Sequence, residues 1–238
     1  MKVFHDLQEW RRFKRTETLG FVPTMGALHD GHLSLIRRSQ QENQRTLVSI
    51  FINPTQFNDP KDFQNYPQTL EQDLAKLQHI DYVLAPNAGQ IYPHGYHYKV
   101  SEDKISNILE GAHRPGHFDG MLTVVLKLLN LARADRAYFG EKDFQQLQLV
   151  RGMAEDFFLD TEIVACPTVR EADGLAMSSR NIRLQSREKA GLFPKLLKHP
   201  NARALLEEAG FEVDYIENWQ GRTLGAVRLD NVRLIDNL

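Results

Sequence analysis

The sequence predicts a doubly wound α/β fold, in which helices cover both faces of a parallel sheet, followed by a small α+β unit. Short apolar runs alternate with helix-like segments from about residue 18 to 166, an alternation typical of parallel strands joined by helical crossovers. Polar, glycine-containing turns follow the runs that end at Val22 and Phe139, and a polar turn follows Ile52. Ligands of such sheets bind beyond the carboxyl ends of the strands, so these turns predict a binding site.

The predicted strands and helices alternate in order along this part of the chain. The strands are residues 18–22, 46–52, 82–85, 136–139 and 161–166, and the helices are 32–42, 69–78, 103–110, 119–132 and 144–157. Asp119 is the expected N-cap of the long apolar helix that runs to Ala132. The strands are predominantly apolar, as expected for strands covered on both faces.

The pattern changes near Arg183. Residues 185–198 and 201–209 have helical patterns, and Gly210 ends the second. Short strands at 211–217, 223–229 and 233–235 then surround a turn at Gln220-Gly221. We therefore expect two domains, residues 1–182 and residues 183–238.

The bulk composition excludes several classes of protein. The 238 residues are 42% hydrophobic and 25% charged, with a net charge of −2, as in a globular protein with a substantial core. Such a charge provides no general attraction for nucleic acid or an anionic membrane, and no apolar run is long enough to span a bilayer. The one cysteine, Cys166, lies in an apolar run. It predicts a buried thiol in a reducing compartment, and we expect the cytoplasm.

The turn at residues 23–32, PTMGALHDGH, carries the strongest functional signal. A strand, a glycine-containing turn and a helix start present free backbone N–H groups and the positive end of a helix dipole, which suits phosphate. Gly26 and Gly31 permit close backbone approach, and His29 and His32 add donors. Two histidines alone are a poor zinc signature, because zinc needs three or four ligands. Phosphate binding is favoured over metal binding, and surface histidines without function remain the alternative.

Three more polar turns follow predicted strands. Asn53 and Gln56 lie in NPTQF, where Pro54 ends the strand; their amides suit a small polar organic substrate. In GEKDFQQ, Lys142 offers a charge to phosphates and Asp143 an acceptor to ribose hydroxyls. The last turn ends in a Ser-Ser-Arg set at residues 178–180, a compact group of donors for a triphosphate. Turn formation or a charged surface is the alternative for each motif taken alone.

A glycine-rich loop at residues 111–120 precedes the long apolar helix and carries Arg114. Arginine binds carboxylates and phosphates through two parallel hydrogen bonds, so this loop could bring a cation to such a group. A solvated connection is equally consistent with its composition.

Taken in order, these motifs resemble the pantothenate synthetases (pantoate–β-alanine ligases), a family of the HIGH-type nucleotidyltransferases with a Rossmann-like fold. The matching segments are PTMGALHDGH (23–32), NPTQF (53–57), RPGHFDG (114–120), GEKDFQQ (140–146), PTVREADGLAMSSRN (167–181) and the closing RLIDN (233–237). The resemblance implies a two-step ligation. Pantoate and ATP give pantoyl adenylate and pyrophosphate, and β-alanine then displaces AMP to give pantothenate.

The resemblance also implies roles for individual residues. His29, His32, Lys142 and Arg180 are expected to be catalytic, with His32 the conventional proton donor. The implied ATP site consists of Met25, Gly26, Ala27, Leu28, His29, Asp30, Gly31, His32, Gly140, Glu141, Lys142, Asp143, Val169, Met177, Ser178, Ser179 and Arg180. Gln56, Gln146, Asn53 and Arg114 are expected to bind pantoate or β-alanine. Magnesium is expected on the ATP phosphates; Asp73 is a candidate to assist it but is assigned as no ligand, and no other metal site is expected.

The resemblance further implies a homodimer and a C-terminal domain that covers the nucleotide as a lid. Residues 183–238 are shorter than the family's usual C-terminal domain, so we expect a reduced lid. Three alternatives differ in class: a nucleotidyltransferase that acts on a phosphate, an RNA-binding relative of the synthetases, and an inactive nucleotide binder. Gln56 and Gln146 favour a carboxylate substrate over the first, and the absence of a basic tract argues against the second.

Overall fold

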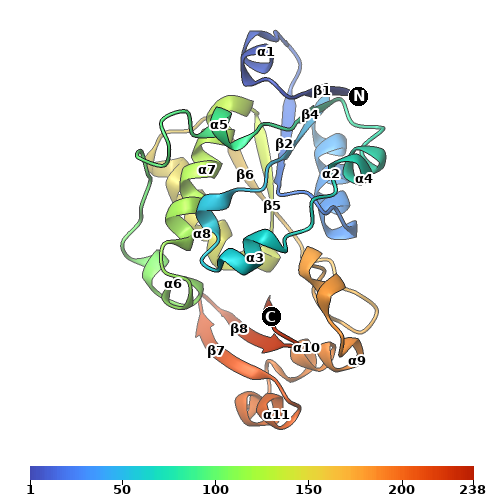
Figure 1. Ribbon diagram of the computed structural model, residues 1–238, viewed down its shortest axis with the longest axis vertical. Helices are drawn as coiled ribbons and strands as arrows, with labels where there is room; N and C mark the ends of the chain where they lie inside the picture. The colour runs from blue at the N-terminus through green and yellow to red at the C-terminus, as the bar shows by residue number, and fades with distance from the viewer.

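Six parallel strands form the main sheet, in the order β1-β4-β3-β2-β5-β6, in a computed structural model that describes residues 1–238 (Figure 1). The strands are β1 (Lys2–Phe4), β2 (Leu19–Thr24), β3 (Arg45–Ile50), β4 (Tyr82–Leu84), β5 (Arg136–Gly140) and β6 (Glu162–Cys166). The α-helices around them are α1 (Leu7–Arg12), α2 (Asp30–Glu42), α3 (Pro60–Gln64), α4 (Leu70–Lys76), α5 (Ala88–Ile91), α6 (Glu110–His113), α7 (His117–Ala132) and α8 (Phe144–Asp156). Four 3-10 turns complete the set: η1 (Pro54–Gln56), η2 (Ile105–Asn107), η3 (Glu141–Asp143) and η4 (Ser179–Arg183).

Successive side chains of the central strands enter two separate cores, because the side chains of a strand alternate between its faces. Phe21 and Leu47 pack with α7 and α8 on one face. Their neighbours Val22 and Val48 pack with α2 and α4 on the other. Figure 1 shows these helix pairs on opposite sides of the sheet. The doubly wound α/β prediction is confirmed.

The order of the strands reverses beside β2. The chain runs from β2 through β3 to β4 in one direction, then returns to place β5 on the other side of β2. Gly20 and Phe21 pair with Arg136 and Ala137 across this junction. A crevice forms beyond the carboxyl ends of strands where such an order reverses. The turns after β2 and β5 are therefore brought together.

A second sheet of three antiparallel strands follows the main one. It contains β7 (Glu212–Trp219), β8 (Arg222–Leu229) and β9 (Val232–Asn237), and it packs with α9 (Arg187–Ala190), α10 (Leu192–Leu196) and α11 (Ala202–Glu208). Its core includes Phe193, Leu206 and Val227. A smaller cluster around Phe144 and Tyr215 joins it to the larger sheet's domain. None of the helices has both the length and the apolar character needed to cross a membrane.

Several local predictions were wrong. Helix α7 begins at His117 with Gly116 as its N-cap, in the left-handed region at φ 78°, so Asp119 lies in the first turn and is not the cap. The helix predicted at 103–110 is instead η2 followed by α6, and the helix predicted at 185–198 is split into α9 and α10. The sequence reading also missed β1, α1, α3 and α5, all short elements of three to six residues. Cys166 is buried as predicted, and burial raises the pKa of its thiol.

Candidate active site

A cavity of about 240 Å³ lies where the strand order reverses, and every predicted motif except the closing RLIDN segment contributes to it. Of the predicted site residues, it is lined by Met25, His29, Gly31, His32, Asn53, Gln56, Arg114, Gly140, Lys142, Asp143, Gln146, Val169, Met177, Ser178, Ser179 and Arg180. Segments more than 150 residues apart in the sequence thus line one cavity. They meet there because their turns lie at the carboxyl ends of strands in one parallel sheet.

Five residues predicted for the ATP site do not line this cavity. They are Gly26, Ala27, Leu28, Asp30 and Glu141. Leu28 is buried in the core shared with α2 and α4, Asp30 is exposed in the first turn of α2, and the Glu141 carboxylate pairs with Arg222 at 3.2 Å.

Asp73 of α4 holds the turn that carries the two histidines. Its buried carboxylate accepts hydrogen bonds from the backbone N–H groups of Ala27 at 2.9 Å and Leu28 at 2.8 Å. It also accepts one from the Thr69 hydroxyl at 3.0 Å. Ala27 has φ 50°, a strained conformation for a residue with a side chain. Asp73 therefore stabilises the turn that carries the two histidines.

The rings of His29 and His32 lie against each other, with centroids 4.0 Å apart. The His29 backbone N–H donates to Nδ1 of His32 at 3.4 Å, which leaves the proton of a neutral His32 ring on Nε2. Burial, reinforced by cationic neighbours including Lys142, lowers the pKa of His29 to about 4 and that of His32 to about 3. A Cβ on Gly31 would lie 2.8 Å from the His29 ring, so only glycine fits beneath it. Both rings are neutral near pH 7.

Asn53 and Gln56 form a linked pair of amides after β3. Asn53, only 1% exposed, donates from Nδ2 to Oε1 of Gln56 at 2.9 Å and accepts at Oδ1 from the Tyr92 hydroxyl at 2.7 Å. Since Oε1 of Gln56 is held by this amide, its Nε2 is directed to Met25 Sδ, 3.2 Å away. The cavity thus contains oriented amide donors, and Gln146 lines the same cavity.

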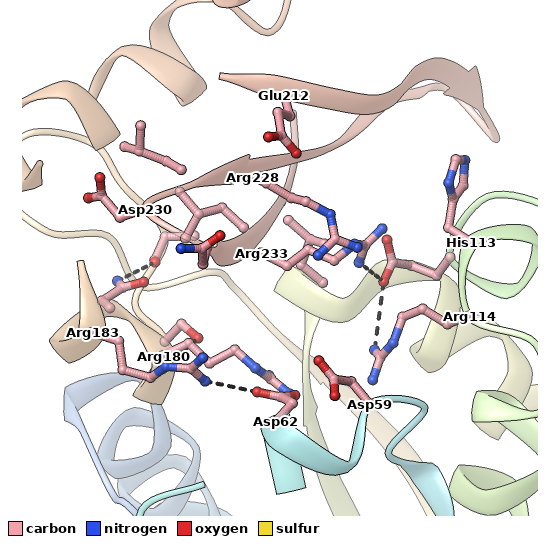
Figure 2. A pocket seen from close by; sticks show the side chains of 18 of the residues that line it. Asp59, Asp62, His113, Arg114, Arg180, Arg183, Glu212, Arg228, Asp230 and Arg233 are labelled. Carbon is pink, nitrogen blue, oxygen red and sulfur yellow. Dashed lines mark hydrogen bonds and ion pairs between the residues drawn. The ribbon is translucent and has the colours of Figure 1, made fainter. Parts of the chain in front are cut away.

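The Ser-Ser-Arg segment is held by α3 and by Tyr66, which follows α3 in the chain. The Tyr66 hydroxyl contacts Ser179 Oγ at 3.1 Å, and the Arg180 guanidinium lies 5.7 Å from the Tyr66 ring centroid. The Asp62 carboxylate accepts from Arg180 and from Arg183, each at 2.8 Å (Figure 2). Helix α3 and its flank therefore fix the donors of η4 from the opposite wall.

The second domain stabilises the turn after β5 through hydrogen bonds. Asn237 of β9 donates from Nδ2 to the carbonyl oxygens of Glu141 and Lys142, each at 2.9 Å. Arg170, in the segment after β6, binds Asp236 of β9 through two hydrogen bonds of 2.7 and 2.9 Å. Lys142, which faces the cavity, is thus held by a strand from the other sheet.

A wider cleft of about 920 Å³ separates the second domain from α3 and α6. It shares Arg114, Lys142, Asp143, Ser178 and Arg180 with the smaller cavity, so the two spaces adjoin. Figure 2 shows Arg180 and Arg183 on one side of this cleft, and Arg233, Arg228 and Asp230 on the domain opposite.

No group of three or more His, Cys, Asp or Glu side chains is arranged to hold a metal ion.

The arrangement suits group transfer between bound substrates. Its donors to an anion are the two imidazoles, the hydroxyls of Ser178 and Ser179, Lys142 and Arg180. Such groups bind phosphate oxygens and stabilise the charge that develops during phosphoryl or acyl transfer.

Comparison with known proteins identifies the family. The family model described as pantoate-beta-alanine ligase matches residues 1–238, the whole chain. The chain belongs to the pantoate–β-alanine ligase family. Its members are ligases that join pantoate to β-alanine, and this protein is such an enzyme. It is 53% identical to the pantothenate synthetase of Bdellovibrio bacteriovorus, over 98% of this chain and 96% of the relative. It is 49% identical to the Legionella pneumophila (strain Corby) pantothenate synthetase, over 100% and 99%.

Solved structures of pantoate–β-alanine ligases share the complete fold. The Francisella tularensis enzyme, complexed with beta-gamma ATP and beta-alanine, has a TM-score of 0.95 at 41% identity, covering 100% of this chain and 97% of its own. Pantothenate synthetase from Thermus thermophilus has a TM-score of 0.93 at 40% identity, covering 100% and 99%. Because these relatives are matched almost end to end, the C-terminal domain is not reduced in comparison with them.

Residues that position the lining residues of the site were harder to predict from the sequence than the lining residues themselves. Asp62, Tyr66, Glu110 and His117 were not predicted as functional. Asp59 accepts from the Lys61 N–H as the N-cap of α3, and Pro60 follows at the first helical position. This Asp-Pro pair is a recognisable helix start and could have revealed α3, but nothing local marks its Asp62 as a partner of Arg180.

Proposed function

We propose that the cavity, together with the wider cleft beside it, binds ATP and pantoate side by side and condenses pantoate with β-alanine through pantoyl adenylate. A carboxylate oxygen of pantoate attacks the α-phosphorus of ATP, and the bond to pyrophosphate breaks. The amine of β-alanine then attacks the activated carbonyl carbon, the bond to AMP breaks, and the ammonium proton is released to solvent. The observation that carries this proposal is the meeting of the His pair, Lys142, the Ser-Ser-Arg segment and two glutamines in one cavity.

In this mechanism the two imidazoles act as neutral donors. Nε2–H of His32 donates a hydrogen bond to a phosphate oxygen and strengthens it as charge builds up, consistent with a ring whose Nδ1 already accepts from the backbone. Lys142 and Arg180 supply fixed positive charge to the leaving pyrophosphate. Ser178 and Ser179 add hydroxyl donors. ATP enters as its magnesium complex, with the ion held by the phosphates.

Pantoate fits the other half of the cavity. Gln56 and Gln146 donate to its carboxylate and hydroxyl oxygens. Phe51 and α7 residues including Met121, Val124 and Leu128 line the cavity beside them, and this apolar wall suits the two methyl groups of pantoate. A nucleotidyltransferase that acts on a phosphate would have little use for this amide and apolar surface. Arg114, at the junction with the wider cleft, is proposed to face β-alanine or pyrophosphate.

Three broader features belong to the same proposal. Residues 183–238 act as the domain that covers the nucleotide, supported by the contacts of Asn237 and Asp236 with the catalytic domain. The enzyme acts as a homodimer, as the family resemblance implies. It works in the cytoplasm, which agrees with a single buried thiol.

The test is the formation of AMP from ATP and pantoate, with and without β-alanine, in magnesium buffer. We expect AMP and pantothenate in equal amounts only when both substrates are present, and pantoate-dependent exchange of pyrophosphate into ATP without β-alanine. A His32→Ala variant, purified in the same way, should be slower by about 100-fold or more. If neither AMP nor exchange depends on pantoate, the proposed function is wrong.

A further inference from the structure

Arg233 of the second domain reaches the catalytic domain at a buried carboxylate, that of Glu110. Glu110 begins α6 and its side chain is only 8% exposed. Its Oε2 accepts from Arg233 Nη1 at 2.6 Å, and its Oε1 accepts from the Tyr215 hydroxyl of β7 at 2.9 Å. Two strands of the second sheet, β7 and β9, therefore meet helix α6 of the catalytic domain at this one carboxylate, on the wall of the wider cleft.

The same carboxylate faces Arg114. Nη1 of Arg114 lies 3.8 Å from Oε2 of Glu110, so one oxygen is shared between two guanidinium groups (Figure 2). Glu110 is itself fixed on the catalytic side, because its backbone N–H donates to the buried Gln145 side chain at 3.0 Å. Removing either partner would leave charge unbalanced in a largely buried place, which is costly.

From Arg114 the contacts continue to the backbone of Gln56. Nη1 of Arg114 lies 3.0 Å from Nε2 of His117, and a guanidinium can only donate, so Nε2 must accept. Nδ1 of the neutral ring then carries the proton and donates to the Gln56 carbonyl oxygen at 2.7 Å. Arg114 Nη2 donates to the same oxygen at 3.4 Å. Burial and the adjacent Arg114 lower the pKa of His117 to about 3, which keeps this ring neutral.

The backbone at Gln56 has little freedom to move away from these contacts. A Cβ on Gly120 would lie 2.2 Å from the Thr55 carbonyl oxygen and 2.8 Å from the Gln56 nitrogen, so η1 lies directly on α7. Packing on α7 and the hydrogen bonds to the carbonyl oxygen therefore act together to fix the Gln56 backbone, while Asn53 holds its side-chain amide.

We propose that Arg233 is a positioning residue for the acid substrate, acting through Glu110, Arg114 and His117 on Gln56. The second domain then has two separate effects on the site: Asn237 holds the turn that carries Lys142, and Arg233 orders the amide pocket about Gln56. The inference rests on the proposed function, because it names pantoate as the ligand of that pocket.

The test compares Arg233→Gln with a matched control, Arg228→Gln. Arg228 lies on the adjacent strand β8 and pairs with Asp214 at 3.4 Å, an acid that Arg233 also binds, but it does not reach Glu110. With ATP saturating, we expect Arg233→Gln to raise the KM for pantoate on the order of tenfold. The KM for ATP should stay within about twofold in both variants, and Arg228→Gln should leave both constants unchanged.

A double variant tests whether the effect of Arg233 on Gln56 passes through His117. In a His117→Asn background, Arg233→Gln should add less than about twofold to the KM for pantoate, because the two changes interrupt the same series of contacts. Glu110→Gln breaks the same pair from the other side and serves if Arg233→Gln does not fold. Equal increases in both KM values, or none in pantoate KM, would overturn the inference. Pantoate-dependent AMP formation by the wild-type enzyme, measured first, separates this result from failure of the proposed function.

Discussion

The carboxylate of Asp62 binds the guanidinium of Arg180 across the cavity at 2.8 Å, with Asp62 on α3 and Arg180 in the Ser-Ser-Arg segment. The same carboxylate binds Arg183 at 2.8 Å. Asp62 therefore keeps two cations close together and fixes one of them at the expected phosphate site. The paired guanidiniums hold the pKa of Asp62 below its usual value, against the effect of its burial.

Replacing Asp62 with Asn should make Arg180 less ordered and leave it beside Arg183 without a counter-charge. We expect kcat/KM for ATP to fall on the order of tenfold, within the range of coupling between contacting residues. Pantoate-dependent pyrophosphate exchange measures this constant. Asp103→Asn, on an exposed side chain away from the site, is the matched control. An Asp62→Asn variant with unchanged ATP kinetics would show that Arg180 does not depend on this pair.

Asp73→Asn should destabilise the turn that carries His29 and His32. An asparagine can present only one oxygen to the two N–H groups of Ala27 and Leu28, so one buried donor loses its acceptor. We expect the free energy of unfolding to fall by about 1–3 kcal/mol, together with the rate of AMP formation. Urea unfolding and the AMP assay measure the two effects. The magnesium concentration needed for half-maximal rate should not change, whereas a role as a metal ligand would shift it upward.

Gln56→Ala should weaken pantoate binding while leaving ATP binding nearly unchanged. The carboxamide that Asn53 orients would be lost, and a hydrogen bond to a charged group contributes about 1.5–3 kcal/mol, so the KM for pantoate should rise by roughly 10- to 100-fold. Steady-state kinetics with each substrate varied in turn gives both constants. Gln72→Ala, at an exposed position on α4, should behave as wild type. An equal loss for both substrates would mean that Gln56 does not belong to the pantoate pocket.

The buried imidazoles make stability depend on pH. The unfolded chain protonates each histidine near its ordinary pKa of 6.5, whereas the folded chain holds His29 near 4 and His32 and His117 near 3. Between pH 6.5 and 4 the unfolded state therefore binds more protons, and the free energy of unfolding must fall as the pH falls through this window. Urea midpoints at pH 7 and 5 should show the decrease, and His29→Gln should reduce it. Equal midpoints for the wild type would contradict the burial of these rings.

Asn237→Asp should weaken ATP binding although the substituted side chain does not contact ATP. The change replaces a donor, 4% exposed in the fold, by a carboxylate facing the carbonyl oxygens of Glu141 and Lys142. Losing a buried donor costs about 1–3 kcal/mol, so the KM for ATP should rise on the order of tenfold. Asn201→Asp, exposed at the start of α11 with no side-chain capping bond, should leave it unchanged. Loss confined to the KM for pantoate would assign this contact to the wrong half of the site.

The sequence predicted the sheet from local patterns, and the lining of the cavity from polar turns at strand ends together with the family resemblance. Apolar runs ending near Val22 and Phe139 mark strand ends, and the polar residues that follow them must lie at one edge of a parallel sheet. The supporting contacts are not local. Asp62 is 118 residues from Arg180, and Glu110 is 123 residues from Arg233. A single acid in a polar stretch looks the same whether it faces solvent or a distant arginine, so neither pair could be recognised.

The hydrogen bonds from Asn237 also set a time at which the site can be complete during synthesis. They join residues 96 and 95 positions apart in the chain, the carbonyl partners being made first. At ordinary translation rates the turn at Glu141 and Lys142 waits roughly 5–20 s for this amide to be synthesised. The nascent catalytic domain can therefore form its six-stranded sheet well before β9 secures the turn at Glu141 and Lys142.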